Sequence, residues 1–327
     1  MPPFKKLPRP SALPAQQIAL LVCIAALGGF MGVTYPGFAT IANAEVIAMG
    51  FVFEGFMALG MTLVIVTGGI DLSVAAVLPF SAILTALLLQ AGAPVPLAVL
   101  VALTVAALIG LFNAMTANGL RVHPFIVTLA TMLSLKGLNL VLTGGGPITG
   151  IPPGFAWIGQ GRLLGVPFPL VLFAAMAVTF AVLLRKHRFW QQTYLIGGNP
   201  RAARTSGVRV PLVLAVVYMV SALCAAIAGL VAAATLGSAS AGFGQNAELR
   251  VITAVVIGGA SLQGGSGSIG GTLLGLSFLA LLYNAFSMTG VSTYWQDVAT
   301  GALVLASALA TELVTRRRAN LLEPGRP

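Results

Sequence analysis

Few residues in this chain could do chemistry, and most of them stand inside long apolar runs. The 327 residues include 7 Asp and Glu, 17 Lys and Arg, and 2 His. Neither His123 nor His187 stands beside an obvious nucleophile, so we expect no catalytic residue and no enzyme. Cys23 and Cys224 lie in apolar runs and indicate neither a disulfide framework nor a metal site.

Charged residues within apolar runs are costly and therefore point to function. Glu54 and Lys136 stand in different runs, at depths that differ by about 3 Å if each run is a spanning helix. We predict that they form a buried ion pair, with Asn139 one turn beyond Lys136 on the same face. A structural pair and a contact to a transported substrate explain the two charges equally well.

Uncharged polar residues in these runs could hydrogen-bond a neutral polyol. The candidates for a substrate pathway are Glu54, Asp71, Asn113, Lys136, Asn139, Asn246 and Asn284. Each asparagine could equally bond a neighbouring helix, which is the commoner use of asparagine in membranes. Asp71 follows Gly68-Gly69 and precedes a fresh apolar run, so we favour a helix cap there over the lining of a polar cavity.

A second glycine-rich break covers residues 264–268. It is no phosphate loop, because no Lys follows its glycines and G-x-x-x-x-G-K-[ST] occurs nowhere in the chain. If ATP drives this protein, a separate chain must hydrolyse it. We therefore expect no cofactor on this chain.

The polar loop 185–210 contains one short predicted helix. Asn199 is a good N-cap, Pro200 suits the first helical position, and Gly207 suits the stop. A helix of under two turns is unstable alone in water, so it must dock on another surface. Lipid headgroups, contacted by the arginines of the loop, and a cytoplasmic partner are the two alternatives.

The elements that position these residues must be membrane helices. Charged residues make up 7% of the chain, against about a quarter in soluble domains, and the mean hydropathy is +0.99. The net charge of +10 reflects scarce acids, which excludes a disordered chain and a nucleic-acid-binding one. Continuous apolar runs favour helices over barrel strands, so the fold class is all-α and polytopic.

About ten runs reach the roughly 20 residues that a spanning helix needs. They cover residues 16–34, 45–67, 71–90, 94–117, 123–143, 167–184, 211–235, 247–261, 268–288 and 294–314. The eighth run is short for a straight span and is the weakest of them. Eight spans are the alternative count.

The positive-inside rule gives the orientation. Most of the 17 cations become cytoplasmic if both termini are inside: Lys5, Lys6, Arg9, Arg121, Arg185, Lys186, Arg188, Arg201, Arg204, Arg209, Arg316, Arg317, Arg318 and Arg326. This predicts a cytoplasmic tail at 1–15, a transmembrane domain at 16–314 with the cytoplasmic loop 185–210, and a second tail at 315–327. A cleaved signal peptide is disfavoured, because the first apolar core is too long.

Small residues recur every four positions in two of the runs. They are Ser221, Ala225, Gly229 and Ala233 in one, and Gly267, Gly271 and Gly275 in the other. Such a stripe lets another backbone approach closely. We expect packing within one subunit, with a dimer face as the alternative.

Four motifs in order resemble a known family. They are GMT at 60–62 with TGGIDLSV at 67–74, IGGNP at 196–200 with AAR and SG at 202–207, VIGGASL with GGSG at 256–267, and YWQ at 294–296. The chain resembles, over almost its whole length, the permease subunits of bacterial ATP-binding-cassette importers for ribose, galactose and related sugars. Residues 35–38 and 189–198 are most similar to a galactofuranose permease. Ala75-Ala76 departs from the glycine usual after Val74.

The resemblance implies a permease subunit in the bacterial inner membrane that passes a monosaccharide inward. It implies three partners besides the lipid bilayer: cytoplasmic ATPase subunits that use ATP, a second permease subunit, identical or related, and a periplasmic sugar-binding protein. The short helix would be the coupling helix seated on the ATPase. Its residues are Gly198, Asn199, Pro200, Arg201, Ala202, Arg204 and Gly207.

Two rival functions stay open at this point. A secondary transporter would need ion-coupling acids, and Glu54, Asp71, Glu248 and Asp297 allow one. An importer of the same kind could instead carry branched-chain amino acids or a signalling furanosyl ester. An amino acid would call for charges facing a zwitterion, so the asparagine-rich interior favours a polyol.

Overall fold

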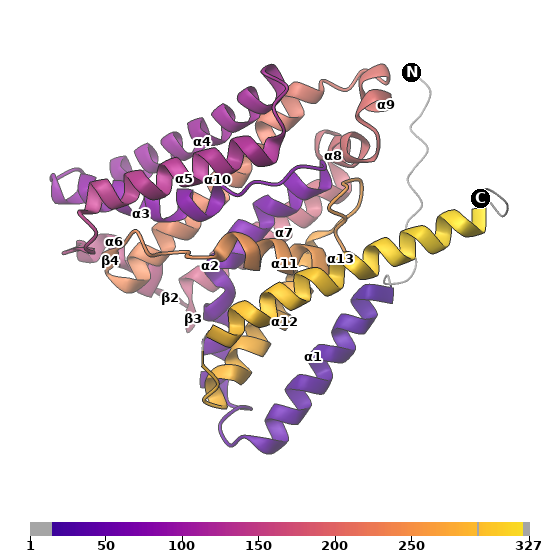
Figure 1. Cartoon of the computed structure of the whole chain (residues 1–327). Coiled ribbons are helices and arrows are strands. Elements are labelled where there is room, and N and C mark those ends of the chain that lie inside the picture. Colours follow the sequence, from indigo (N-terminus) through magenta and orange to yellow (C-terminus); the bar gives the residue numbers. More distant parts are fainter. Residues whose placement is uncertain (1–14, 293, 323–327) are drawn as a thin grey trace.

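The computed structural model describes the backbone of residues 15–292 and 294–322, and their side chains up to Ser307 and at Leu309. Helices form most of it. In chain order they are α1 (Ala15–Thr34), α2 (Ile41–Val66), α3 (Val74–Gln90), α4 (Val95–Gly119), α5 (Pro124–Thr143), α6 (Pro153–Gln160), α7 (Phe168–Lys186), α8 (Arg188–Gly198), α9 (Pro200–Thr205), α10 (Val210–Leu236), α11 (Ala247–Ile257), α12 (Ile269–Met288) and α13 (Tyr294–Leu322). Figure 1 shows the long helices running side by side.

The described strands have two residues each and form two small antiparallel ladders. β1 (Ile148–Thr149) pairs with β4 (Ser238–Ala239), and β2 (Arg162–Leu163) pairs with β3 (Val166–Pro167). These ladders only close loops between helices.

Seven of the described helices are long and apolar enough to cross a membrane: α1, α2, α4, α5, α7, α10 and α12. α3 is apolar but has only 17 residues. α11 has 11 residues, so it is about 16 Å long, roughly half of the bilayer's hydrocarbon thickness. The prediction of a continuous span at 247–261 was therefore wrong, because a left-handed Asn246 precedes α11 and Gly258-Gly259 end it.

The tenth predicted span, 294–314, falls within α13. α13 continues to Leu322, past the predicted boundary with the second tail at 315. Residues 1–14 of the predicted first tail, with Lys5, Lys6 and Arg9, lie outside the described residues, as does Arg326.

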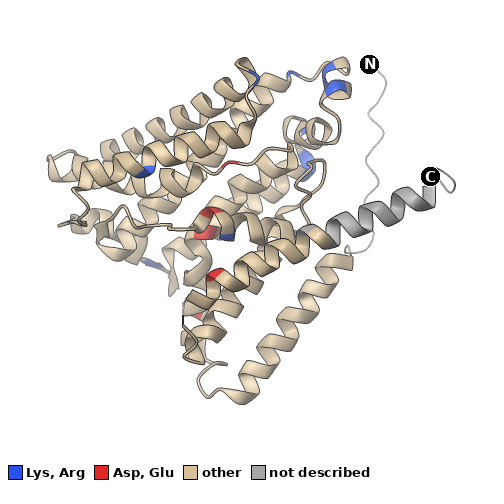
Figure 2. Cartoon of the chain, in the orientation of Figure 1, with Lys and Arg blue, Asp and Glu red and all other residues tan. Residues whose placement is uncertain are grey.

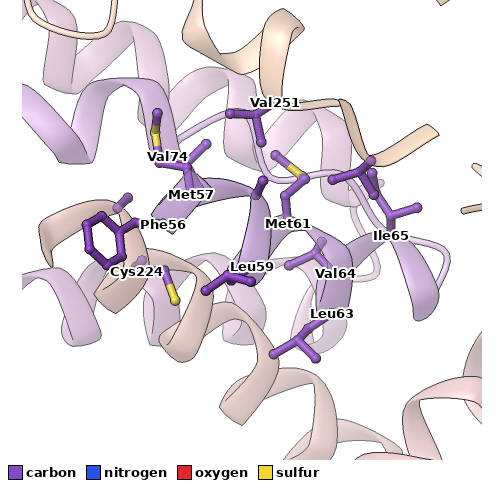
Figure 3. Close-up of a cluster of buried hydrophobic side chains, with 14 of the residues drawn as sticks. Phe56, Met57, Leu59, Met61, Leu63, Val64, Ile65, Val74, Cys224 and Val251 are labelled. Carbon is purple, nitrogen blue, oxygen red and sulfur yellow. The ribbon is translucent and has the colours of Figure 1, made fainter. Parts of the chain in front are cut away.

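α2 is the central helix of the protein. Every residue from Gly55 to Val66 is buried, because apolar side chains cover all of its faces and neighbours pack on each. Figure 3 shows these side chains pointing outward from α2 in several directions, toward Cys224 of α10 and Val251 of α11. A helix that is apolar all round is stable only inside a helix bundle.

The predicted stripes of small residues serve packing within the subunit. A Cβ on Gly229 of α10 would lie 2.1 Å from the carbonyl oxygen of Leu78 in α3. A Cβ on Gly275 of α12 would lie 1.9 Å from the carbonyl oxygen of Ala254 in α11. Backbones therefore touch at both stripes, and no second subunit is needed to explain them.

One end of the molecule carries α8, α9 and the two glycine-rich breaks. The side chain of Gln16, at the start of α1, donates to the carbonyl oxygens of Val256 and Ile257, each at 3.1 Å. Figure 1 shows α1 beginning at the end of the molecule where α8 and α9 lie. Lys and Arg gather on α8 and α9 at this end, whereas the helices between the two ends carry few charges (Figure 2).

Candidate functional site

A short capped helix stands apart from the long apolar ones. The Oδ1 atom of Asn199 accepts hydrogen bonds from the backbone N–H groups of Arg201 and Ala202, each at 3.0 Å. Pro200 occupies the first helical position, where a missing N–H costs little. Gly207 follows with a φ of +83°, a left-handed conformation that favours glycine. The predicted start and stop of this helix, α9, are confirmed.

α9 turns its arginines outward. Ala203 is buried among residues of the main core, whereas Arg201, Ala202 and Arg204 are exposed. Within the described part of the chain, neither arginine forms an ion pair. The surface of α9 therefore offers two free guanidinium groups, which are suited to carboxylate or phosphate groups of another molecule.

Two ion pairs lie between helices in the described part of the chain, and neither is the predicted one. Glu54 of α2 accepts from Nε of Arg250 at 2.5 Å, and Lys136 of α5 donates to Glu248 at 3.2 Å. The predicted Glu54–Lys136 pair was wrong because α11 supplies a separate partner to each. Residues two apart on a helix point to nearly opposite sides, so Glu248 faces α5 while Arg250 faces α2.

Asn139 does not join either pair. It is fully buried, and its Nδ2 donates to the carbonyl oxygen of Ala76 in α3 at 3.2 Å. The side chain of Lys136 is 38% exposed, so the two residues occupy different environments. The two residues lie one turn apart on α5, as predicted, but Asn139 bonds to α3 whereas Lys136 bonds to Glu248 of α11.

A cavity of about 140 Å³ lies beside the Glu54–Arg250 pair. Its lining residues are Gly50, Phe53, Glu54, Met57, Leu78, Ala232, Leu236, Phe243, Gly244, Ala247 and Arg250. The walls are apolar except for the carboxylate and the guanidinium, which can accept and donate hydrogen bonds. An apolar pocket with a few convergent polar groups is typical of a small-molecule site.

The cavity lies far from α9. α10 begins at Val210, directly after α9, and reaches the cavity at Ala232, about 33 Å along the helix. The cavity therefore stands toward the end of the molecule opposite to the exposed arginines.

Asp71 is the end point of a buried chain of hydrogen bonds between four segments. Thr131 of α5 donates to Asn113 of α4 at 2.6 Å, and Asn113 donates to the Ser73 hydroxyl at 2.9 Å. The Ser73 hydroxyl donates to Oδ1 of Asp71 at 2.5 Å, and Ser221 of α10 donates to Oδ2 at 2.8 Å. The carboxylate thus ties the break after α2 to three helices.

The predicted helix cap at Asp71 differs in detail from the structure. α3 begins at Val74 with Ser73 as its N-cap residue, and Ser73 makes no side-chain cap bond. Oδ1 of Asp71 instead accepts from the N–H of Ser73 at 3.1 Å, in the turn that leads into α3. The carboxylate therefore both orders this turn and bonds to α10.

The other asparagines are also engaged by protein groups. Asn246 donates to Asp297 at 3.4 Å, and Asn284 exchanges two hydrogen bonds with Asn43 at 2.9 and 3.2 Å. Of the predicted pathway residues, Glu54 is the one that lines the cavity. The asparagines therefore hold helices together here. This is the role of bonding a neighbouring helix, which the sequence left open as the alternative to binding substrate.

Arg250 and Ser221 were missing from the sequence-based candidates. Arg250 is a cation in an apolar run, and that signal alone could have placed it beside Glu54 and Lys136 as a candidate. Ser221 belongs to the stripe of small residues and carries no sequence signal for a bond to Asp71. Only packing reveals that bond.

Comparison with known proteins identifies the family. Residues 43–308 match the family model described as "Branched-chain amino acid transport system / permease component". The chain is 39% identical over 294 residues to the ribose import permease protein RbsC of Bacillus subtilis, covering 86% of this chain and 91% of the relative. It is 38% identical over 296 residues to RbsC of Escherichia coli K12, covering 89% and 91%.

A further relative carries a different name. The autoinducer 2 import system permease protein LsrD of Escherichia coli HS is 34% identical over 274 residues, covering 82% of this chain and 83% of the relative. No solved structure matches the chain.

The matched region runs from the third residue of α2 through α12 into α13, and it therefore includes the cavity, the Asp71 chain and α9. The seven apolar helices among the described residues and these matches make this a multi-pass protein of the bacterial inner (plasma) membrane. The chain therefore belongs to this family of permease components, and it is similar to ribose import permeases over 91% of their length.

Proposed function

We propose that this chain is the transmembrane subunit of an ATP-binding-cassette importer that passes a monosaccharide inward. The observation that carries the proposal is the similarity to ribose import permeases over 86–89% of the chain, which includes the exposed, arginine-bearing α9. ATP would be hydrolysed by separate subunits, because this chain carries no phosphate-loop motif.

The proposed topology has ten crossings with both termini cytoplasmic. The seven long apolar helices account for seven, and α3, α13 and α11 with the segment before it account for the others. The loop 185–210 is then cytoplasmic, which agrees with its dense Lys and Arg content. The cavity beside Glu54 would face the periplasm.

α9 is the proposed contact with the ATPase. Its exposed surface includes Arg201, Ala202 and Arg204, while its cap residue Asn199 and the buried Ala203 hold it on the protein. A rigid, positively charged projection suits an acidic groove on a partner better than the diffuse surface of lipid headgroups. Gly198, Pro200 and Gly207 would set its ends.

The cavity is the proposed entry of the substrate pathway. A sugar hydroxyl both donates and accepts, so the Glu54 carboxylate and the Arg250 guanidinium could each bind one. Phe53 and Phe243 line the same cavity and could pack on the apolar face of a sugar ring. At 140 Å³ the cavity lies below the usual range of about 300–1,000 Å³ for ligand sites, so it must widen when the importer cycles.

Three partners complete the proposed assembly: ATPase subunits in the cytoplasm, a second permease subunit, identical or related, and a periplasmic sugar-binding protein. The binding protein would select the sugar and deliver it to the cavity side. Asp71, Asn113, Lys136, Asn139, Asn246 and Asn284 stay predicted pathway residues, although protein groups occupy their hydrogen bonds here.

The comparisons suggest two other cargos, of which one is favoured. The similarity to the autoinducer 2 permease LsrD favours a signalling molecule of that kind as the second candidate. The family description names branched-chain amino acids, but the charges at the cavity neutralise each other, which leaves no unpaired charge for a zwitterion.

Uptake by cells tests the proposal. Cells that lack this chain should take up labelled ribose or a related monosaccharide more slowly, and the gene should restore uptake. Depletion of ATP should stop uptake, while collapse of the proton and sodium gradients should not. Uptake that follows the gradients instead would identify a secondary transporter and overturn the proposal.

A further inference from the structure

Three chain segments meet backbone to backbone just before α9. They are the end of α8 at Gly197, the break after α2 at Gly68, and the break between α11 and α12 at Gly264-Gly265. We call these four residues the glycine junction. A Cβ on Gly197 would lie 2.0 Å from the carbonyl oxygen of Val66 and 2.4 Å from the nitrogen of Gly265.

The contact at Gly264 closes the junction on its other side. A Cβ there would lie 2.7 Å from the nitrogen of Gly68 and 2.8 Å from the Cα of Gly197. No side chain fits between the three segments at either point. At both points, therefore, backbone atoms of one segment lie directly against backbone atoms of the others.

Hydrogen bonds fasten the same three segments. The N–H of Gly265 donates to the carbonyl oxygen of Val66 at 2.9 Å, and the hydroxyl of Tyr194 in α8 donates to the carbonyl oxygen of Gly267 at 2.9 Å. Burial raises the pKa of Tyr194, so this hydroxyl stays a donor at neutral pH. These two hydrogen bonds therefore hold the three segments in contact at the glycine junction.

Each segment leads directly to a functional element. Gly198 and Asn199 join Gly197 to α9, and Gly69 and Ile70 join the break after α2 to Asp71. The segment 258–263 joins the third break to α11, whose Arg250 lines the cavity. A displacement of α9 can therefore reach the junction through Gly198 and Asn199. From the junction, short stretches of chain lead on to Asp71 and to α11.

We infer that the glycine junction is the mechanical link that carries a displacement of α9 to the Asp71 segment and to α11. The inference rests on the proposed function, because it takes α9 to be where the ATPase pushes. Side chains could absorb a displacement by changing rotamer, whereas touching backbones cannot. Glycine is required here because it alone allows this contact. Gly68, Gly197, Gly264, Gly265 and Tyr194 are positioning residues under this inference.

Two glycines provide a matched test. Gly197→Ala adds a methyl group where the junction is closed, and Gly270→Ala, at the exposed start of α12, adds the same group where nothing lies within 4 Å. Each variant is assembled with its ATPase and binding protein in proteoliposomes, and substrate uptake is measured per ATP hydrolysed. Copurification with the ATPase is measured in parallel.

We expect Gly197→Ala to copurify with the ATPase and hydrolyse ATP, but to transport at least about fivefold less substrate per ATP, the low end of typical coupling between sites. Gly270→Ala should match the parent protein. Full coupling in Gly197→Ala would overturn the inference, as would equal losses in both variants. Absence of ATP-driven uptake by the parent protein would overturn the proposed function instead.

A second variant covers the case in which Gly197→Ala fails to reach the membrane. Tyr194→Phe adds no volume and removes only the hydrogen bond to Gly267. We expect it to retain ATPase binding and to lower the transport per ATP measurably. Wild-type coupling in Tyr194→Phe would then count against the junction.

Discussion

Two ion pairs in the interior of the described part of this protein each join two different helices. Glu54 and Arg250 join α2 to α11, and their side chains are only 17% and 21% exposed. Pairing of this kind avoids the cost of a charge without a partner in a medium of low dielectric constant. α11, although too short to span the membrane, thereby holds a fixed position against α2.

The Glu54–Arg250 pair predicts that the losses of stability caused by two single substitutions do not add in the double variant. Glu54→Gln and Arg250→Gln should each destabilise the protein by about 1–3 kcal/mol, because each leaves one partly buried group without its charged partner. The double variant should be more stable than the sum of the two losses by about 1 kcal/mol. Thermal unfolding in detergent measures this coupling.

The pair Glu54–Lys136 is the matched control for that cycle. These residues do not contact each other, so the losses of Glu54→Gln and Lys136→Gln should add within about 0.5 kcal/mol. Strong coupling in this second cycle would contradict the ion pairs described above.

The hydrogen bonds of the Asp71 carboxylate predict that three substitutions destabilise the protein to different extents. Asp71→Ala leaves the donors of Ser73 and Ser221 without an acceptor and should cost several kcal/mol, at about 1–3 kcal/mol for each unsatisfied group. Asp71→Asn keeps one acceptor oxygen, and the Ser221 hydroxyl can reverse its role, so its loss should be smaller. Ser221→Ala should cost about 1 kcal/mol. Equal losses in all three, measured by thermal unfolding, would rule out the hydrogen-bonded chain as the cause.

At the scale of elements, α10 depends on its small residues to touch α3. Gly229→Ala should destabilise the protein by about 1–3 kcal/mol, because the new Cβ would overlap the carbonyl oxygen of Leu78. Gly137→Ala in α5 is the control, since nothing lies within 4 Å of its added Cβ. That control should be neutral or stabilising by up to about 1 kcal/mol. Thermal unfolding and yield in the membrane compare the two.

α9 gives a prediction about assembly. Arg201→Glu with Arg204→Glu should leave membrane insertion and stability intact, because both side chains are exposed and make no ion pair in the described part of the chain. Copurification of the ATPase should be lost, since the charge offered to its groove is reversed. Unchanged copurification would indicate that α9 rests on lipid.

At the scale of the whole molecule, α9 and the β2–β3 turn should lie on opposite sides of the membrane, because the 19-residue helix α7 leads from one toward the other. Single thiols at Thr205 and Leu164 can test this after the native cysteines, Cys23 and Cys224, are replaced. A membrane-impermeant reagent should label Leu164→Cys in intact cells and Thr205→Cys only after lysis. Labelling of Thr205→Cys in intact cells would overturn the orientation and the proposed role of α9.

Short-range patterns in the sequence were enough to predict most of the helices. The apolar runs predict α1, α2, α4, α5, α7, α10 and α12 within a few residues, because a helix in a membrane must satisfy its own backbone and be apolar over its length. Asn199, Pro200 and Gly207 likewise determine α9, since a cap is a contact between residues two or three apart. The family is equally evident from ordered motifs.

Which helices are neighbours was decided by the tertiary structure alone. Depth along a helix made Glu54 and Lys136 suitable partners, yet α11 stands where it can pair with each of them separately. Likewise, the sequence marks Asp71, Gly68, Gly197 and Gly264 as unusual residues, but their contacts with Ser221 and with one another join segments far apart in the chain. Hydropathy depends on each residue's own side chain, whereas contacts between helices depend on how all of their surfaces fit together.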